Sequence, residues 1–276
     1  MSDRRTRAVV SAVALAAVII VGRCSPGSAE RPSLASGGPT ASTTPRSMAP
    51  PPSPGMRCAE KLKGARLVRF DSETGVQLGG AILGTGPAGV VLVHGSLADL
   101  CEWLPFAGRF PSDEFTVLAI DLNGFGSSPP SATSPRDPHY DLDAQAGVAT
   151  LRSAGVRSVA LVGESIGGTA VILAGAALDP PVNAVVDLSG PAEISGMDAA
   201  AAAPALTMPV LFVRSERDGD DDGIERVIER TRPRLAKTEV VPGNRHGISL
   251  LDPLAEPEAE RLQMLVIEFI RGHARP

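Results

Sequence analysis

Apolar segments typical of buried strands alternate with helix-like segments over most of this 276-residue chain. A largely apolar stretch over 158–162 is followed by an alanine-rich, helix-like stretch over 166–178, and the alternation continues to residue 271. Strands that are apolar throughout, rather than at every second position, are typical of a sheet buried on both faces. The pattern therefore predicts an α/β fold, with helices covering both faces of a mostly parallel sheet.

The predicted elements fill the chain from residue 76 onward. In open parallel sheets, functional sites form at the carboxyl ends of the strands, so the residues that follow each strand are the first candidates for function. Strands are expected over 76–83, 90–93, 116–122, 158–162, 182–188, 210–213 and 238–241, and helices over 102–110, 140–154, 166–178, 224–232 and 256–271.

The first 29 residues have the pattern of an export signal. A basic start precedes an uncharged apolar run over 8–21, and small residues follow at Gly27 and Ala29. The run is shorter than the roughly 20 apolar residues of a membrane-spanning helix, so a permanent anchor is the second choice. Two processing routes stay open. One is cleavage near Ala29; the other is lipidation of Cys24, although Arg23 stands where a bacterial lipobox has a small residue. We expect an exported protein, either secreted or attached to the outer face of the cell membrane.

Residues 30–56 predict a disordered linker, because this Pro/Ser/Thr-rich stretch has too few large apolar side chains to offset the entropy of ordering. Residues 57–276 are then long enough for one α/β domain. The formal net charge is −5, and the first 29 residues carry +3, which leaves −8 for the remainder. A negative domain repels phosphate backbones, and aromatic residues make up only 3% of the chain, so nucleic acid is not expected as a partner.

Three cysteines are present. If Cys24 is removed or lipidated, Cys58 and Cys101 remain as a pair in an exported protein, and disulfides persist in that environment. We expect the two to be bonded. The alternative is two buried free thiols, because spacing along the chain does not give a distance in space.

The strand expected over 158–162 runs directly into the sequence Gly-Glu-Ser-Ile-Gly at 163–167, and a helix follows. A strand, a sharp turn and a helix around this pattern form a nucleophile elbow, which lifts the hydroxyl of Ser165 clear of the backbone. Gly163 and Gly167 lack the Cβ atoms that would block the close approach of strand and helix. Because the five-residue pattern also arises by chance, the flanking elements carry the prediction. A glycine-rich helix start capped by Ser165 is the alternative.

A serine hydroxyl becomes a nucleophile only with a base beside it and a carboxylate that orients the base. His246 is favoured as the base among four histidines, because its loop lies between the strand expected over 238–241 and the last helix. An ordinary surface histidine is the alternative. Asp218 is favoured as the acid because it follows the strand over 210–213 and lies between nucleophile and base in chain order. Asp220 and Asp187 stay open as alternatives for the acid.

Two backbone donors are expected for the negative oxygen that forms during attack on a carbonyl. The strand over 90–93 ends in His94, Gly95 and Ser96, and a tight turn there would direct the Ser96 N–H toward the pocket. The N–H of Ile166, directly after the nucleophile, would face it. A plain turn from strand to loop is the alternative.

Taken together, these residues resemble the α/β-hydrolase superfamily from Ala65 to about Arg271. The resemblance implies an eight-stranded, mostly parallel sheet with an antiparallel strand near its start. It is similar to an exported actinobacterial branch in which a cysteine before the first strand and one shortly before a tryptophan recur, here Cys58 and Cys101. The matching features are His94-Gly95, Trp103, the segment Asp-Leu-Asn-Gly-Phe-Gly-Ser-Ser at 121–128, the elbow at Ser165, and the acid and histidine loops in family order.

The resemblance does not identify a substrate, because the superfamily includes esterases, peptidases, thioesterases, epoxide hydrolases and dehalogenases. The last two use a carboxylate at the elbow, so Ser165 argues against them. Residues 191–208 leave room only for a short helix or loop, so no large cap domain is expected. An uncapped site favours accessible esters of modest size, or a bulky ester bound across an open face.

Other motifs do not fit their context. The glycine-rich stretch over 84–89 matches a dinucleotide pattern but leads into a strand rather than a helix, and no lysine follows the elbow glycines as a phosphate-binding loop requires. No cluster of His, Cys and carboxylates has the spacing of a metal site. We therefore expect neither a cofactor nor a metal ion.

The sequence predicts a secreted or cell-envelope serine hydrolase that cleaves a small-molecule carboxylic ester through Ser165, His246 and Asp218 by way of an acyl-enzyme. The alternatives are a peptidase or thioesterase with the same residues, and an exported binding module without activity. A tether to the membrane through the amino terminus or a lipidated Cys24 stays open, and the oligomeric state is not predicted.

Overall fold

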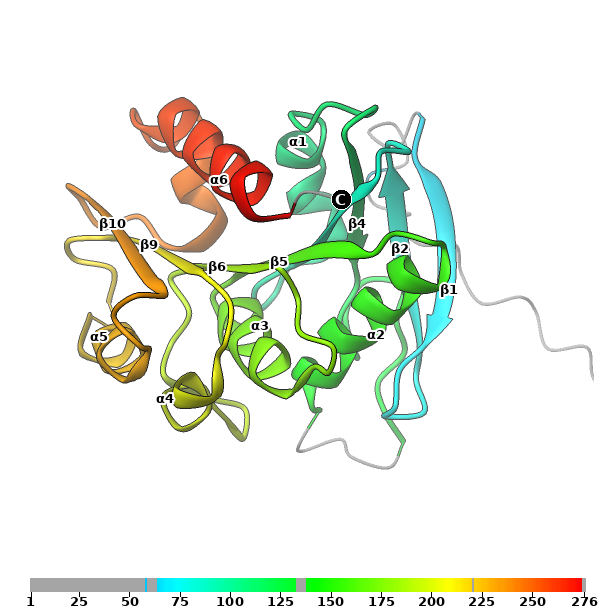
Figure 1. Ribbon diagram of the computed structural model, residues 1–276, viewed down its shortest axis with the longest axis horizontal. Helices are drawn as coiled ribbons and strands as arrows, with labels where there is room; N and C mark the ends of the chain where they lie inside the picture. Colours follow the sequence, from blue (N-terminus) through cyan, green and yellow to red (C-terminus); the bar gives the residue numbers. More distant parts are fainter. Residues whose placement is uncertain (1–57, 59–63, 133–137, 220, 275–276) are drawn as a thin grey trace, which may run out of the picture. The chain divides into compact units, whose positions relative to one another are not determined.

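The computed structural model describes Cys58 and residues 64–132, 138–219 and 221–274 (Figure 1). The predicted export signal, the predicted linker, Cys24 and the alternative acid Asp220 lie outside the described residues. Within the described ranges, no helix combines the length and apolar character needed to cross a membrane.

A sheet of eight strands lies at the centre of the fold, in the order β1-β2-β4-β3-β5-β6-β9-β10. Strand β2 pairs antiparallel with both β1 and β4, and all the remaining neighbouring strands of this sheet pair in parallel. The predicted α/β fold, with a mostly parallel sheet and an antiparallel strand near its start, is confirmed. The strand bounds are β1 Arg66–Asp71, β2 Gln77–Leu83, β3 Ala88–Val93, β4 Phe115–Ile120, β5 Ser158–Glu164, β6 Ala184–Leu188, β9 Val210–Ser215 and β10 Ala236–Val241.

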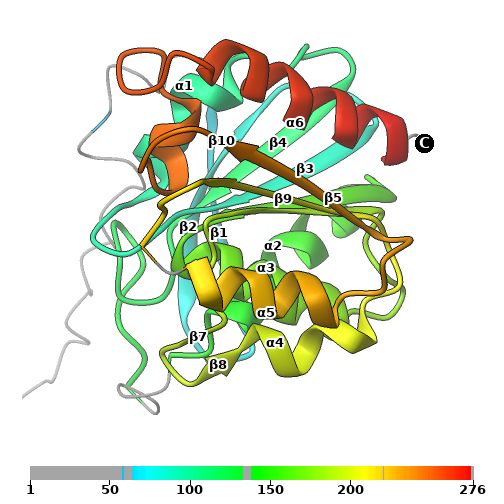
Figure 2. The same ribbon diagram turned by 90° about the vertical axis from the view of Figure 1, so that its left-hand side faces the viewer.

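Helices cover both faces of this sheet. In Figure 2, α1 and α6 lie on one side of the strands and α2, α3, α4 and α5 lie on the other. Every residue of β3, β4, β5 and β6 is buried between these layers, as expected for strands that are apolar throughout. The helix bounds are α1 Leu104–Ala107, α2 Tyr140–Ser153, α3 Ile166–Ala177, α4 Ala199–Ala202, α5 Asp221–Arg230 and α6 Ala259–His273.

Strand β1 and the segment 100–110 are two of the places where the structure differs from the predicted elements. Strand β1 was not predicted, because this edge strand is exposed or half-buried along its length and lacks a continuous apolar run. The helix expected over 102–110 is instead a 3-10 helix at Leu100–Trp103 followed by the single turn of α1, which begins with a proline at its first or second position. Proline fits the first turn of a helix but not the interior, so a new helix starts here.

Residues 191–208 contain no large cap domain. They form the two-residue strands β7 (Glu193–Ile194) and β8 (Met197–Asp198), the short helix α4 and a 3-10 turn at Ala203–Ala205. The expectation of a short insertion at this point is confirmed.

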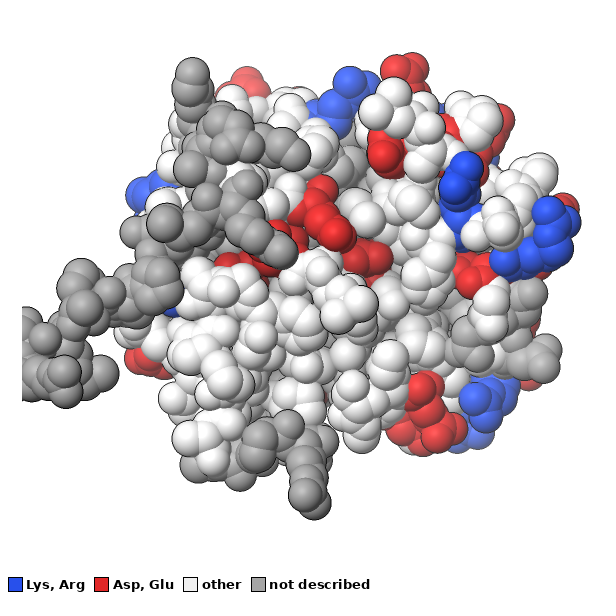
Figure 3. Space-filling model, turned by 180° about the vertical axis from the view of Figure 1, so that it is seen from behind, with Lys and Arg blue, Asp and Glu red and all other residues white. Residues whose placement is uncertain are grey.

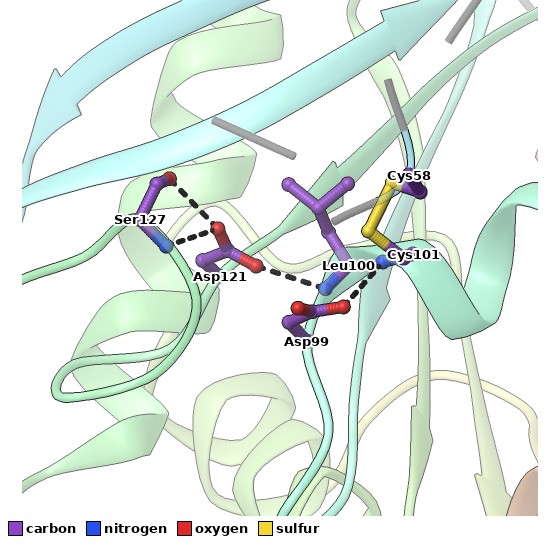
Figure 4. Close-up of a disulfide and its surroundings, with 6 residues drawn as sticks. All are labelled: Cys58, Asp99, Leu100, Cys101, Asp121 and Ser127. Carbon is purple, nitrogen blue, oxygen red and sulfur yellow. Dashed lines mark hydrogen bonds between the residues drawn. A yellow bond between two sulfur atoms is a disulfide. The ribbon is translucent and has the colours of Figure 1, made fainter. Parts of the chain in front are cut away.

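A disulfide joins Cys58 to Cys101, with Cα atoms 5.8 Å apart, as predicted (Figure 4). Beside it, Asp99 accepts a hydrogen bond from the Cys101 N–H at 3.0 Å and so caps the 3-10 helix. Asp121 accepts the Leu100 N–H at 2.8 Å and both the N–H and the hydroxyl of Ser127, at 2.8 and 2.7 Å. The segment 121–128 therefore fixes the chain that follows β3.

Candidate active site

The three predicted catalytic residues follow three strands that run in the same direction. Ser165 comes directly after β5, Asp218 follows β9, and His246 follows β10. These strands belong to one parallel run of the sheet, in the order β5-β6-β9-β10, so their carboxyl ends lie along one edge. Sites of open α/β sheets form at this edge.

Ser165 has the strained backbone of a sharp turn, with φ 52° and ψ −122°. This conformation is rare for a residue with a side chain and is typical of functional sites. The Ser165 N–H donates to the Leu188 carbonyl of β6 at 2.9 Å, which anchors the turn to the next strand. Helix α3 begins at the next residue, so the Ile166 N–H belongs to the first turn and has no partner within the helix.

The two elbow glycines lie where backbone segments approach each other closely. A Cβ atom on Gly163 would lie 2.1 Å from the Gly167 carbonyl oxygen, and a Cβ atom on Gly167 would lie 2.4 Å from the Val93 carbonyl oxygen. No side chain fits at such distances. Glycine at both positions is therefore a steric requirement of the strand, turn and helix.

His246 and Asp218 are in direct contact. The His246 Nδ1 lies 2.5 Å from Asp218 Oδ1. The hydrogen bond to Asp218 is the main cause that raises the pKa of His246 above its usual 6.5, against the opposing effect of partial burial. Asp187, the alternative acid on β6, is fully buried and accepts the Gly190 N–H at 2.8 Å. Burial raises its pKa to about 7. The structure thus pairs Asp218, and not Asp187, with His246.

Hydrogen bonds join the end of β9 and the acid loop (216–219) to the histidine loop (242–248). The Arg217 N–H donates to the Gly243 carbonyl at 3.0 Å, and the Ser215 hydroxyl donates to the Arg245 carbonyl at 2.6 Å. The side chain of Ser249 binds both the N–H and the carbonyl of His246. The imidazole is therefore held by contacts on its own backbone as well as by Asp218.

Ser189 is a polar residue of this site that the sequence analysis did not single out. Its hydroxyl donates to Asp218 Oδ2 at 2.6 Å and accepts the Gly247 N–H at 2.9 Å. Its backbone is in the left-handed region, with φ 61°. The signal available in the sequence was its place after the strand expected over 182–188, at the same edge of the sheet as the nucleophile.

The Ser165 hydroxyl makes no hydrogen bond to the His246 ring within the described residues. Catalytic hydrogen bonds of this kind are often long without substrate and shorten when it binds. The segments that carry the two residues do touch, because Glu164 Oε2 accepts the Ile248 N–H at 3.0 Å.

The loop after β3 is fixed by a buried histidine. The Leu122 N–H donates to His94 Nε2 at 3.1 Å, so the ring proton is on Nδ1, which lies 2.7 Å from the Gly95 carbonyl oxygen and donates to it. Burial lowers the pKa of His94, which favours this neutral form. In a trans peptide the C=O and the following N–H point in opposite directions, so the N–H of exposed Ser96 faces away from His94.

On the face drawn in Figure 3, acidic side chains lie near the middle and basic side chains lie toward the edges. Across the described ranges, no group of three or more His, Cys, Asp and Glu side chains is arranged to hold a metal ion. The groups described at the carboxyl edge of the sheet include the Ser165 hydroxyl, the His246 imidazole, carboxylates and backbone N–H donors.

Comparisons with known proteins agree with the fold described above. The family model described as serine aminopeptidase, S33 matches residues 86–195. An esterase from Pyrococcus furiosus has a similar structure, with a TM-score of 0.62 and 17% identity, over 78% of this chain and 94% of that one. An esterase from a Rhodococcus species gives a TM-score of 0.62 at 17% identity, over 74% of this chain and 98% of that one. Comparison with curated protein sequences finds no match.

The order and direction of the eight strands, the family match over 86–195 and these similar structures together show that the chain has the α/β-hydrolase fold.

Proposed function

We propose that this protein is a serine hydrolase that cleaves carboxylic esters, with Ser165 as nucleophile, His246 as general base and Asp218 as the group that orients the base. The observation that carries the proposal is the 2.5 Å contact between His246 and Asp218, at the sheet edge where the strained turn presents Ser165. This combination supplies the three roles that an activated serine requires.

The reaction follows from these positions. With the Nδ1 proton donated to Asp218, the Nε2 of His246 takes the proton of the Ser165 hydroxyl as its oxygen attacks the ester carbonyl carbon. The Ser96 and Ile166 N–H groups stabilise the negative oxygen of the tetrahedral intermediate. The carbon–oxygen bond to the alcohol then breaks, and the alcohol leaves with the proton from Nε2. Water, activated by His246, attacks the acyl-enzyme, releases the carboxylic acid and restores Ser165.

The short segment over 191–208 supports a preference for accessible esters. Because no large cap from this segment encloses the acyl group, the pocket supplies little extra apolar contact to a long chain. We expect hydrolysis of p-nitrophenyl esters to be fastest with short acyl chains. A rate profile that rises steadily to long chains would contradict this preference.

Export of the enzyme is part of the proposal. The basic and apolar start of the sequence supports it, and so does the disulfide between Cys58 and Cys101, because such bonds persist outside the reducing cytosol. The enzyme would act outside the cell or on the outer face of the membrane. Fractionation of cells that express the full chain, with and without Cys24→Ala, tests this placement and the lipid anchor together.

A second candidate function is an aminopeptidase that uses the same residues. The family match over 86–195 favours it, since that family is described as serine aminopeptidases. The two candidates differ in the leaving group, which is an alcohol in one and an amine in the other. A series of p-nitrophenyl esters compared with aminoacyl p-nitroanilides separates them, and faster cleavage of the anilides would favour the peptidase.

Covalent labelling tests the proposed chemistry most directly. A fluorophosphonate reacts with an activated serine, so we expect labelling of the wild-type protein to map to Ser165 by mass spectrometry. Labelling should disappear in Ser165→Ala and persist in Ser112→Ala, because Ser112 is exposed and lies just before β4, at the other end of the sheet. Folded protein without labelling at Ser165 would instead support a binding module.

A further inference from the structure

We propose that Glu164, the residue before the nucleophile, is a positioning residue that holds the oxyanion loop (94–98) and the histidine loop on either side of Ser165. This inference rests on the function proposed above. Glu164 is the last residue of β5 and is 5% exposed. It has no part in the reaction described above, so its burial at this point needs a separate explanation.

One carboxylate links both loops to the elbow. Glu164 Oε1 accepts the Gly95 N–H, and Oε2 accepts the Ile248 N–H at 3.0 Å. The first partner precedes Ser96 by one residue, and the second follows His246 by two. Glu164 itself precedes Ser165, so the nucleophile, the oxyanion donor and the base each lie within two residues of a group that this carboxylate orders.

Glycines on both loops make room for the carboxylate. A Cβ atom on Gly95 would lie 2.2 Å from Glu164 Oε1, and a Cβ atom on Gly247 would lie 1.9 Å from Oε2. Either distance is far below van der Waals contact, so a side chain at either position would displace the carboxylate. Glycine at these two positions therefore lets both loops approach the Glu164 carboxylate closely enough to contact it.

Gly95 is held at both of its polar atoms. Its N–H is bound by Glu164 and its carbonyl oxygen by the buried His94 ring. The orientation of the next N–H, that of Ser96, follows from these two contacts because the peptide is planar. Without Glu164, the Gly95 N–H is left unsatisfied in a buried position, and the loop gains freedom to rotate the oxyanion donor away.

The charge of Glu164 also acts on the base. Hydrogen bonds from two N–H groups favour the ionised carboxylate, although burial raises its pKa. The other carboxylates that face His246 are Asp218, in direct contact, and the buried Asp187 on β6. The negative charge of Glu164 adds to the effect of Asp218 in raising the pKa of His246.

Two substitutions test the length and the charge of the Glu164 side chain separately. Glu164→Gln places an amide nitrogen opposite one of the two N–H donors, so that loop loses its acceptor and the charge is lost. We expect kcat for p-nitrophenyl acetate to fall about 100-fold, the typical cost of one oxyanion donor, with little change in KM. In the plot of kcat/KM against pH, the acid limb, where activity falls as pH is lowered, should move to lower pH. Glu164→Asp keeps the charge but is one methylene too short, so kcat should fall while the acid limb stays in place.

The matched control is Glu229→Gln, which removes the same charge from an exposed position on α5. It should leave both kcat and the pH profile unchanged. A folded Glu164→Gln protein with kcat within about twofold of the wild type and an unmoved acid limb would overturn the proposal. A wild-type protein without Ser165-dependent hydrolysis would overturn the proposed function instead, and the two failures are therefore distinguishable.

Hydrogen exchange gives a second test that does not depend on activity, and its measurement on the wild-type protein needs no variant. Because the Gly95 and Ile248 amides donate to a buried carboxylate, they should exchange slowly in the wild-type protein. Where Glu164→Gln folds, exchange at one or both should be more than about tenfold faster, which corresponds to the loss of one hydrogen bond to a charged group. Fast exchange of both amides in the wild-type protein would overturn the proposal.

Discussion

Asp218 and His246 form a contact that is buried on one side and open on the other. The Asp218 side chain is 4% exposed, whereas the His246 side chain, 2.5 Å away, is 44% exposed. The carboxylate is therefore fixed and shielded from water, while the imidazole remains accessible to a substrate. This asymmetry suits a pair in which one group orients the ring and the ring exchanges protons.

Replacement of Asp218 by Asn tests this pair. We expect kcat to fall by about 10⁴-fold, since an amide favours the wrong ring tautomer. The base must be neutral to act, so activity is lost as pH falls through the pKa of His246. That pKa is raised mainly by Asp218, so the wild-type acid limb should lie above pH 6.5 and move to lower pH in the variant. The measurement is kcat/KM for p-nitrophenyl acetate against pH.

Asp220→Asn is the control for the same experiment, because Asp220 was the closest alternative for the acid in the sequence. Its rate and pH profile should match those of the wild-type protein. If kcat fell by about 10⁴-fold in Asp220→Asn and stayed unchanged in Asp218→Asn, the carboxylate that orients His246 would be Asp220.

Ser189→Ala should weaken catalysis without unfolding the protein. The substitution removes the hydroxyl that donates to Asp218 and leaves the Gly247 N–H without its acceptor. We expect about a tenfold loss of kcat, which corresponds to about one hydrogen bond, with little change in KM. Steady-state kinetics of Ser189→Ala and of the distant control Ser112→Ala provide the comparison. Equal rates in the two variants would show that Ser189 does not position the acid.

The central strands and the elbow were readable from the sequence because local signals and burial agree there. β5 is apolar throughout, and the glycines around Ser165 are required by contacts within the same strand, turn and helix. By contrast, β1 carries a mixed pattern because it lies at the edge of the sheet, where no continuous apolar run is needed.

The choice among carboxylates was not readable in the same way. In the sequence, Asp218, Asp220 and Asp187 all follow or lie near the end of an expected strand, and only the positions of the loops in space decide which carboxylate contacts the His246 ring. The roles of Glu164 and Ser189 also depend on contacts across the fold. Glu164 accepts hydrogen bonds from residues 69 and 84 positions away in the sequence, and Ser189 accepts one from a residue 58 positions away. A local sequence pattern cannot predict contacts between residues so far apart in the sequence.

The disulfide should contribute substantially to stability. In the chain-entropy model, closing a loop between residues 43 apart stabilises the folded state by about 4 kcal/mol, and measured values are usually lower. We expect Cys58→Ala/Cys101→Ala to have a lower free energy of unfolding by about 2–4 kcal/mol in urea titrations. Addition of a reductant should destabilise the wild-type protein by a similar amount and leave the variant unchanged. A reductant effect in the double variant would show that the loss has another source.

Buried Asp187 should make stability depend on pH. Burial raises its pKa from 3.8 to about 7 in the folded protein, so between these values the folded state holds a proton that the unfolded state has lost. The free energy of unfolding therefore falls as pH rises from about 4 to about 7. Asp143, whose pKa burial also raises to about 7, acts in the same direction, as does His246 above pH 6.5. A single variant is needed to isolate the contribution of Asp187.

Asp187→Asn removes this titration while an amide oxygen can still accept the Gly190 N–H. We expect its free energy of unfolding to fall less than that of the wild-type protein between pH 4.5 and pH 8, so that the variant gains relative stability as pH rises. Urea titrations at pH 4.5, 6 and 8 provide the measurement, with the exposed Asp113→Asn as control. Because a buried charge that lacks a full set of partners is costly, the gain at pH 8 should be several times that of the control. Parallel pH curves for wild type and Asp187→Asn would mean that the carboxyl group is ionised in the folded protein, stabilised by the Gly190 N–H in spite of its burial.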